Sequence, residues 1–204
     1  YERAGKVRLK DGSIGSVTIG GTVSPAGGNF DEPVTQATLK VVGAFHGLSR
    51  ERSDARKYPA INPTESWSKY TGIIPMDRVE ESRSILKRSI EINQMMKVVG
   101  EEGTTAEDYI TYQKGELLDA VYLQQNSFDP IDAADSPERQ RVEFDLLYDA
   151  LMQQYDLEDK DEIRSFFNQL RQEFLDWHGT EFNSDAFEAQ KNKIADFYKS
   201  KAIA

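Results

Sequence analysis

Residues 24–36 contain the combination of glycine, proline and acidic residues in this sequence that is best suited to form a functional loop. Gly27 and Gly28 tolerate positive φ and allow another backbone or a ligand to approach closely. Asp31 can accept hydrogen bonds from the first free N–H groups of a helix, and Pro33 suits the first turn of that helix. The segment therefore predicts a rigid glycine-rich loop that leads into a helix beginning at Pro33.

The sequence lacks the loop that phosphate chemistry requires. A nucleotide hydrolase cradles phosphate with the motif Gly-x-x-x-x-Gly-Lys-Ser/Thr and also supplies a carboxylate for the attacking water. Gly5-Lys6 is followed by Val7, and the pairs Gly20-Gly21 and Gly27-Gly28 lack the lysine. We therefore expect no catalytic residue in this chain and no ATP hydrolysis by the chain alone.

Other catalytic groupings are also missing from the sequence. The chain has no cysteine, which excludes disulfides and thiolate zinc sites. Its two histidines, His46 and His178, lie far apart in the sequence. Because there is no Ser-His-Asp grouping and no His-rich metal spacing, we interpret both histidines as structural and expect no metal site.

The composition is that of an acidic chain of low hydropathy. Its 204 residues carry a formal net charge of −10 and are 38% hydrophobic. Nucleic acid and anionic lipid both favour a basic surface, so this charge argues against either as a direct partner. The sequence contains no run of eighteen apolar residues and no signal-peptide pattern, so we expect no direct membrane insertion.

The first 75 residues are rich in Gly, Pro, Val and Thr and predict short elements. Apolar and basic residues alternate over 6–10, ahead of a turn at Asp11-Gly12, and 16–19 form a second β-prone run. The remaining expectations for this part are a short helix at 33–40, a strand at 41–48 and one or two helical turns at 50–57.

Residues 76–204 instead predict five helices with apolar stripes, which is typical of a helical bundle. Thr104 and Glu107 form a capping-box pattern ahead of a helix whose apolar positions extend to Phe128. Ser136-Pro137 opens the next helix, and 183–185 open the last one. The strongest stripe consists of Ile163, Phe166, Phe167, Leu170, Phe174 and Trp177, which we interpret as bundle core.

Three motifs, in the same order along the chain, resemble one known family. Residues 24–36 are similar to its Ser-Pro-x-Gly-Gly-x-x-x-Glu-Pro-Val-Thr-Gln segment, and 58–62 are similar to its aromatic-Pro-Ala-Ile-Asn turn. Residues 123–130 are similar to its Leu-Gln-Gln-Asn-x-Phe-Asp element, and 1–5 to the end of a preceding helix. The chain thus resembles a carboxy-terminal piece of the catalytic A subunit, or alpha chain, of bacterial-branch V-type (vacuolar/archaeal-type) rotary ATPases.

This resemblance implies a mainly α fold with two parts. Residues 1–75 would be a short C-terminal remnant of the α/β nucleotide-binding domain, and residues 76–204 would be the C-terminal helical bundle. The resemblance is specific over about residues 1–135 and holds only in general character over the last seventy.

The resemblance also implies roles for particular residues. Tyr58 and Phe128 would bind adenine, since two aromatic rings can clamp its flat, apolar faces. The alternative is that both are ordinary core aromatics. Glu32, Pro33 and Gln36 would contribute to the interface with a neighbouring subunit.

An acidic turn separates two of the expected helices. Glu101, Glu102, Glu107 and Asp108 occupy the position at which catalytic subunits of the resembled family contact the central rotor stalk. The alternative is a solvated loop with a capping acid, which is the usual role of a run of charges.

For the intact subunit, the resemblance implies ATP hydrolysis or synthesis coupled to H⁺ or Na⁺ transport, with ATP or ADP and Mg²⁺ as ligands. Its partners would be the B subunits of the catalytic ring and the central rotor stalk, at the cytoplasmic face of a membrane. We expect no nucleotide to be tightly bound to this chain alone. The rival hypothesis is an autonomous helical protein-interaction module with no nucleotide role.

Overall fold

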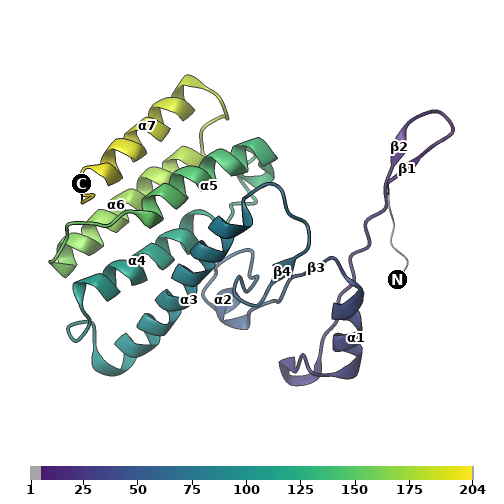
Figure 1. The fold of residues 1–204 in the computed structure, drawn as a ribbon, viewed down its shortest axis with the longest axis horizontal. Helices are drawn as coiled ribbons and strands as arrows, with labels where there is room; N and C mark the ends of the chain where they lie inside the picture. Colours follow the sequence, from purple (N-terminus) through teal and green to yellow (C-terminus); the bar gives the residue numbers. More distant parts are fainter. Residues whose placement is uncertain (1–5, 204) are drawn as a thin grey trace. The chain divides into compact units, whose positions relative to one another are not determined.

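The computed structural model describes residues 6–203, which fall into two compact units (Figure 1). One unit ends at Phe45 and the other begins at His46. The predicted likeness of residues 1–5 to the end of a helix lies outside the described residues. Helices dominate the described part of the chain, which confirms the mainly α fold class. The division between residues 75 and 76 stays a prediction.

The first unit contains a small antiparallel hairpin. Strands β1 (Val7–Arg8) and β2 (Ile14–Gly15) pair with Val7 opposite Gly15. Gly12 turns the chain at a φ of 86°, where a side chain would be strained. The predicted strand at 16–19 is wrong, because none of the described residues pairs with this range. A β-prone sequence does not make a strand without a partner for its backbone groups.

Helix α1 (Pro33–Val41) confirms the predicted helix with Pro33 in the first turn. The expected cap is wrong: the N-cap residue is Glu32, and no side chain caps the helix. The amide of Asp31 instead donates to the side-chain oxygen of Asn29 at 3.0 Å, within the turn that follows the 3₁₀ helix η1 (Ala26–Gly28). The predicted strand at 41–48 shrinks to β3 (Ala44–Phe45), because α1 extends through Val41.

The second unit begins with a looped segment. It holds the short helix α2 (Arg50–Asp54), which Ser49 caps by accepting from the amide of Arg52, and strand β4 (Trp67–Ser68). An antiparallel bridge joins Leu48 to Ile61, and the amide of Ser49 donates to the carbonyl oxygen of Ala60 at 2.8 Å. These bonds fold residues 47–62 back on themselves.

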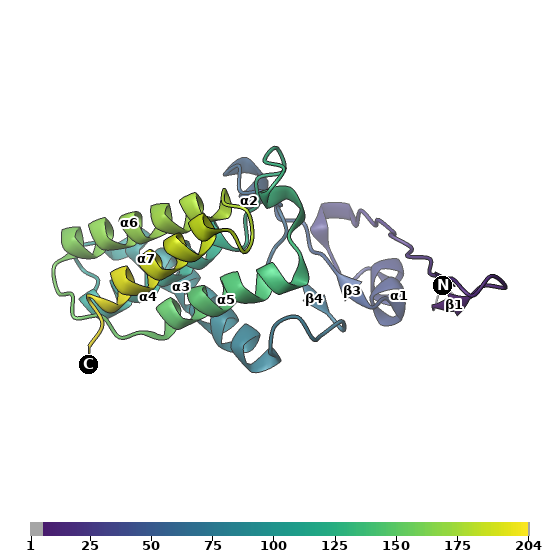
Figure 2. The ribbon, with the colours of Figure 1, turned by 90° about the horizontal axis from the view of Figure 1, so that it is seen from above.

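Five long helices follow, as predicted. They are α3 (Met76–Val99), α4 (Ala106–Val121), α5 (Pro137–Met152), α6 (Lys160–His178) and α7 (Asp185–Lys199), with the 3₁₀ helix η2 (Asp132–Ala134) ahead of α5. Helix α3 packs on α4, α4 on α6 and α6 on α7, while α5 contacts α3, α4 and α7. Figures 1 and 2 show this arrangement as a bundle. Among the described residues, no helix combines the length and apolar character that crossing a bilayer demands.

The core of the bundle lies where the sequence predicted it. The apolar stripe on α6 is buried along its length, and Trp177 at its end is fully buried. The indole N–H of Trp177 donates to the carbonyl oxygen of Phe187 at 3.0 Å, so its polar atom is satisfied inside the core. Phe187 packs against the same ring at a centroid distance of 4.7 Å, which joins α7 to α6.

Two of the predicted helix starts are confirmed and one is shifted. Ser136 and Ser184 accept hydrogen bonds from the amides of Arg139 and Phe187, as N-caps do. The capping box predicted at Thr104 is wrong by one residue, because Thr105 accepts from the amide of Asp108. Thr104 is buried and its hydroxyl donates to the carbonyl oxygen of Gly100 instead.

Helices α3 and α4 approach very closely at one glycine. A Cβ atom placed on Gly115 would lie 2.2 Å from both Cβ and Oγ of Ser89. The Ser89 hydroxyl donates to the carbonyl oxygen of Tyr112 at 3.1 Å, across the same contact. The absence of a side chain at Gly115 therefore sets the distance between the two helices.

Candidate functional site

Phe128 lies on a loop between α4 and η2, here called the Phe128 loop (residues 122–131). Its side chain is 95% exposed. The expectation that the α4 stripe continues to Phe128 is wrong, because α4 ends at Val121. The alternative of a core aromatic also fails for this residue within the chain, since a core side chain is buried. Aromatic residues are enriched at interfaces, where they are exposed until the partner binds.

The Phe128 loop is held by its own polar side chains. Asn126 accepts from the amide of Phe128 at 3.1 Å, and Asp129 accepts from the amide of Ile131 at 2.9 Å. The carboxylate of Asp132 accepts from the amide of Asn126, and its carbonyl oxygen accepts from the side chain of Gln125 at 2.6 Å. Local hydrogen bonds from side chains to the backbone stabilise a turn where no helix or strand hydrogen bonds are available. Phe128 is therefore presented on an ordered turn.

Tyr58 lies on the looped segment at the start of the second unit and is 54% exposed. Its carbonyl oxygen accepts a hydrogen bond of 3.1 Å from the amide of Gln125 in the Phe128 loop. A backbone bond thus joins the two segments that carry the predicted adenine-binding residues, although they are about seventy residues apart. This pairing brings the Tyr58 and Phe128 segments together in the same unit.

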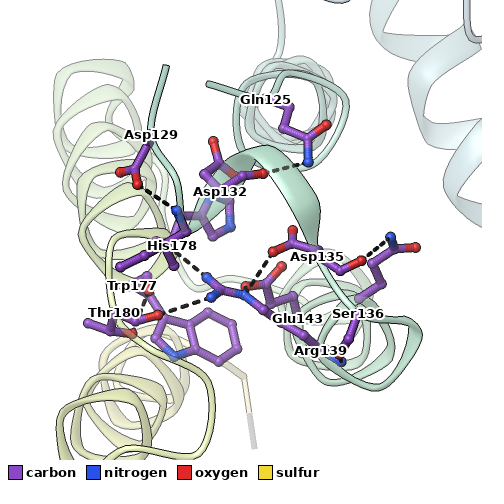
Figure 3. A network of polar contacts seen from close by, with 12 residues as sticks. Gln125, Asp129, Asp132, Asp135, Ser136, Arg139, Glu143, Trp177, His178 and Thr180 are labelled. Atoms are coloured by element: carbon purple, nitrogen blue, oxygen red, sulfur yellow. Dashed lines mark hydrogen bonds and ion pairs between the residues drawn. The ribbon is translucent and has the colours of Figure 1, made fainter. Parts of the chain in front are cut away.

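A buried charged network lies just beyond the Phe128 loop and η2 (Figure 3). Arg139 on α5 is 4% exposed in its side chain and lies 2.7 Å from Glu143 and 3.1 Å from Asp135. The guanidinium also donates to the carbonyl oxygens of His178 at 2.7 Å and Thr180 at 3.0 Å. The network therefore ties Asp135, just after η2, to the end of α6.

Burial dominates the electrostatics of this network. It raises the pKa of Glu143 to about 7, although Arg139 opposes the change. Burial likewise raises the pKa of Asp135 and lowers that of His178, which favours the neutral imidazole. Sequence analysis missed this network; the charged residues at 135, 139 and 143, spaced four apart, were the available signal.

The predicted interface residues belong to the first unit. Glu32 and Pro33 are exposed at the start of α1, while Gln36 is partly buried. The side-chain amide of Gln36 donates to the carbonyl oxygen of Phe30 at 2.8 Å, which folds the preceding loop over the first turn of the helix. Glu32 and Pro33 are therefore presented on an ordered helix start.

The acidic turn between α3 and α4 is bound to neighbouring helices. Glu101 pairs with Arg164 of α6, and Asp108 pairs with Arg88 of α3 at 2.9 Å. The ammonium of Lys160 donates to the carbonyl oxygens of Glu101 at 2.6 Å and Glu102 at 3.0 Å. Glu102 and Glu107 are exposed. The four predicted rotor-contact residues thus divide into an internally paired set and an outward-facing set.

Within residues 6–203 the structure contains no group of three or more His, Cys, Asp or Glu side chains arranged to hold a metal ion. The two described histidines lie far apart in the sequence of the second unit. His46 is its first residue, and His178 is the last residue of α6, where its carbonyl oxygen accepts from Arg139.

Comparison with known families gives two matches along the chain. Residues 1–68 match the nucleotide-binding domain of the ATP synthase alpha/beta family. Residues 76–166 match the C-terminal domain of V and A type ATP synthase. The bundle is therefore of the kind found at the end of ATP synthase subunits, joined to part of a nucleotide-binding domain.

Individual relatives agree with these matches. The V-type ATP synthase alpha chains of Borrelia turicatae and Treponema denticola are each 61% identical to this chain, over 203 and 202 residues. These alignments cover 100% and 99% of this chain but 35% and 34% of the relatives. The chain thus spans about a third of the length of the curated relatives it matches.

A solved structure supports the fold alone. It is described as a unique ATP synthase subunit, NeqB, from Nanoarcheaum equitans, with a TM-score of 0.53 and 17% identity. The likeness covers 63% of this chain and 32% of that one.

Fold and family matches together define a subunit of the ATP synthase alpha/beta class. Within that class, the chain belongs to the family of V-type ATP synthase alpha chains, whose carboxy-terminal region it matches. The resemblance drawn from the three sequence motifs is thereby confirmed.

Proposed function

We propose that Tyr58 and Phe128 form the adenine side of the nucleotide pocket in a V-type ATPase catalytic subunit. The observation that carries the proposal is the exposed Phe128 ring on an ordered loop, bonded through Gln125 to the backbone of Tyr58. Aromatic faces bind any flat base without a demanding hydrogen-bond pattern. Both rings are exposed in this chain. In this proposal, the bound nucleotide covers them in the intact subunit.

In the intact subunit this pocket takes ATP or ADP with Mg²⁺, and the phosphate-binding loop comes from sequence outside this chain. The subunit hydrolyses or synthesises ATP and couples that reaction to H⁺ or Na⁺ transport. It works at the cytoplasmic face of a membrane as a peripheral part of the complex. The family membership supports this proposal, and the chain's own residues contribute the adenine side of the pocket.

Two further surfaces complete the proposed role. Glu32, Pro33 and Gln36 contribute to the interface with a B subunit, and the ordered start of α1 supports this because it holds them in a fixed arrangement. Glu102 and Glu107 contact the central rotor stalk, while Glu101 and Asp108 hold the turn against α6 and α3. The division of the acidic residues into paired and exposed sets supports this assignment.

The test is Phe128→Ala in the assembled ATPase. Stacking on adenine is remote from the γ-phosphate, so we expect the nucleotide KM to rise about tenfold while kcat changes little. Tyr70→Ala is the matched control, since Tyr70 is also an exposed aromatic, at 80%, in the same unit. A loss confined to kcat, or equal effects of the two variants, would assign Phe128 another role and favour an interaction module.

A further inference from the structure

Asp119 lies between the two segments that carry the proposed adenine-binding residues. It is on the last turns of α4, 5% exposed, and the Phe128 loop begins just after it. Its two carboxylate oxygens accept from different cations: one from Arg52, and the other from Lys57 at 2.6 Å. Both cations belong to the segment that leads into Tyr58.

The backbone of Asp119 faces the other segment. Its carbonyl oxygen accepts from the side-chain amide of Gln124 at 3.2 Å. The next residue, Gln125, donates its amide to the carbonyl oxygen of Tyr58. One residue of α4 therefore holds the Tyr58 segment through its side chain and the Phe128 loop through its backbone.

The charges around Asp119 make its carboxylate hard to replace. The Arg52 side chain is 12% exposed, and its Nε and Nη2 atoms find no hydrogen-bond partner among the described residues. Asp119 is thus the acidic group bonded to a guanidinium that is otherwise poorly satisfied. Burial alone would lower the pKa of Lys57, but the hydrogen bond to Asp119 and the charges of Glu116 and Asp119 raise it. The cluster therefore favours the charged form of Lys57 and holds both cations in place.

We propose that Asp119 is a positioning residue for the adenine-binding face: it fixes the Tyr58 segment against the Phe128 loop and so sets the distance between the two rings. The consequence for nucleotide binding rests on the proposed function. The positioning of Tyr58 by Asp119 does not, and it can be measured without nucleotide.

The first arm of the test uses the chain itself. Asp119→Asn keeps the shape of the side chain but removes its charge, which takes away the carboxylate paired with Arg52 and leaves Lys57 with the longer pair to Glu116, at 3.6 Å. We expect hydrogen exchange of the Gln125 amide, which is bonded to Tyr58, to accelerate at least tenfold. Glu173→Gln is the matched control, because Glu173 is also a buried carboxylate, paired with Lys193 at 2.6 Å on α6 and α7. It should leave Gln125 exchange unchanged.

A milder variant covers the case in which Asp119→Asn fails to fold. Lys57 is partly exposed, so Lys57→Met removes one partner of Asp119 and leaves the pair with Arg52 intact. It should accelerate Gln125 exchange by a smaller factor than Asp119→Asn. Unchanged Gln125 exchange in Lys57→Met and in any folded Asp119→Asn protein overturns the proposal.

The second arm uses the assembled ATPase and links the position to nucleotide binding. Asp119→Asn should raise the KM for ATP several-fold with kcat nearly constant, while Glu173→Gln should change neither. If Phe128→Ala raises KM and Asp119→Asn does not, the positioning role is wrong and the adenine role stands. If Gln125 exchange accelerates in Asp119→Asn but Phe128→Ala leaves KM unchanged, the positioning role stands and the adenine role is wrong.

Discussion

The amide nitrogen of Gln125 lies 3.1 Å from the carbonyl oxygen of Tyr58, and this bond joins two loops from distant parts of the sequence. Each loop carries one exposed aromatic ring. Because the bond is between backbone atoms, it constrains the backbone of both loops directly. An aromatic clamp needs this kind of support, since its rings must already be in place when a flat ligand arrives.

The close approach of α3 and α4 gives a direct test of the bundle. Gly115→Ala should destabilise the chain by about 1–3 kcal/mol, because the new Cβ would overlap Ser89 and force the helices apart. Urea unfolding measures this free energy. Gly179→Ala is the control, since its nearest neighbour would be the Asp176 carbonyl oxygen at an ordinary 3.7 Å. Equal stabilities of the two variants would mean that the helices do not meet at Gly115.

The buried carboxyl of Glu143 predicts how stability depends on pH. Burial raises its folded pKa to about 7 from 4.5, so between these values the folded state binds a proton that the unfolded state has lost. The contribution of Glu143 to the free energy of unfolding should therefore fall, by about 1–3 kcal/mol, as the pH rises from 4.5 to 7, while the lowered pKa of His178 acts in the opposite direction. Denaturant titrations across this range measure it.

Glu143→Gln identifies the group responsible for that pH dependence. The amide can still accept a hydrogen bond from Arg139, but it has no proton to lose, so this part of the slope should disappear. Glu173→Gln serves as the comparison, because it removes another buried carboxylate outside the Arg139 network. A slope that survives in Glu143→Gln would assign the titration to another group.

The acidic turn yields a prediction with a built-in comparison. In the assembled complex, Glu102→Gln with Glu107→Gln should reduce the number of ions transported per ATP hydrolysed. The reason is that, in the proposed function, these exposed charges contact the central rotor stalk. Neutralising exposed charges should change stability by less than about 1 kcal/mol. Hydrolysis and ion transport are measured on the same vesicles.

The paired acids of the turn form the comparison set. Glu101→Gln with Asp108→Asn breaks the pairs to Arg164 and Arg88 and should loosen the turn. Hydrogen exchange over 100–108 should therefore accelerate in this variant and stay unchanged in the Glu102 and Glu107 variant. If ATP hydrolysis stays normally coupled to ion transport in both variants, the acidic turn has no role in rotor contact and is a solvated loop.

The bundle could be predicted from the sequence because its information is local. The apolar stripe from Ile163 to Trp177 repeats at helical spacing, and Ser136 and Ser184 mark helix starts that the structure confirms. The strand expected at 16–19 failed because pairing depends on residues elsewhere in the chain. The shift of a cap from Thr104 to Thr105 reflects two adjacent residues that are equally able to cap.

The candidate site was only partly predictable for the same reason. Family motifs pointed to Tyr58 and Phe128, but nothing local indicated that Gln125 bonds to Tyr58. Asp119 escaped notice because its partners, Arg52 and Lys57, lie more than sixty residues earlier in the sequence. Clusters of this kind form only when the chain folds, so sequence spacing does not reveal them.

The most direct test of the adenine role compares two ligands that differ only in the nucleoside. The full-length alpha chain that carries this sequence is titrated with Mg-ATP and with Mg-tripolyphosphate, before and after Phe128→Ala. Base stacking on an aromatic ring is worth about 1–3 kcal/mol, so the variant should bind ATP about tenfold more weakly and tripolyphosphate equally well. Equal weakening for both ligands, or no change for either, would contradict the assignment of Phe128 to the adenine pocket.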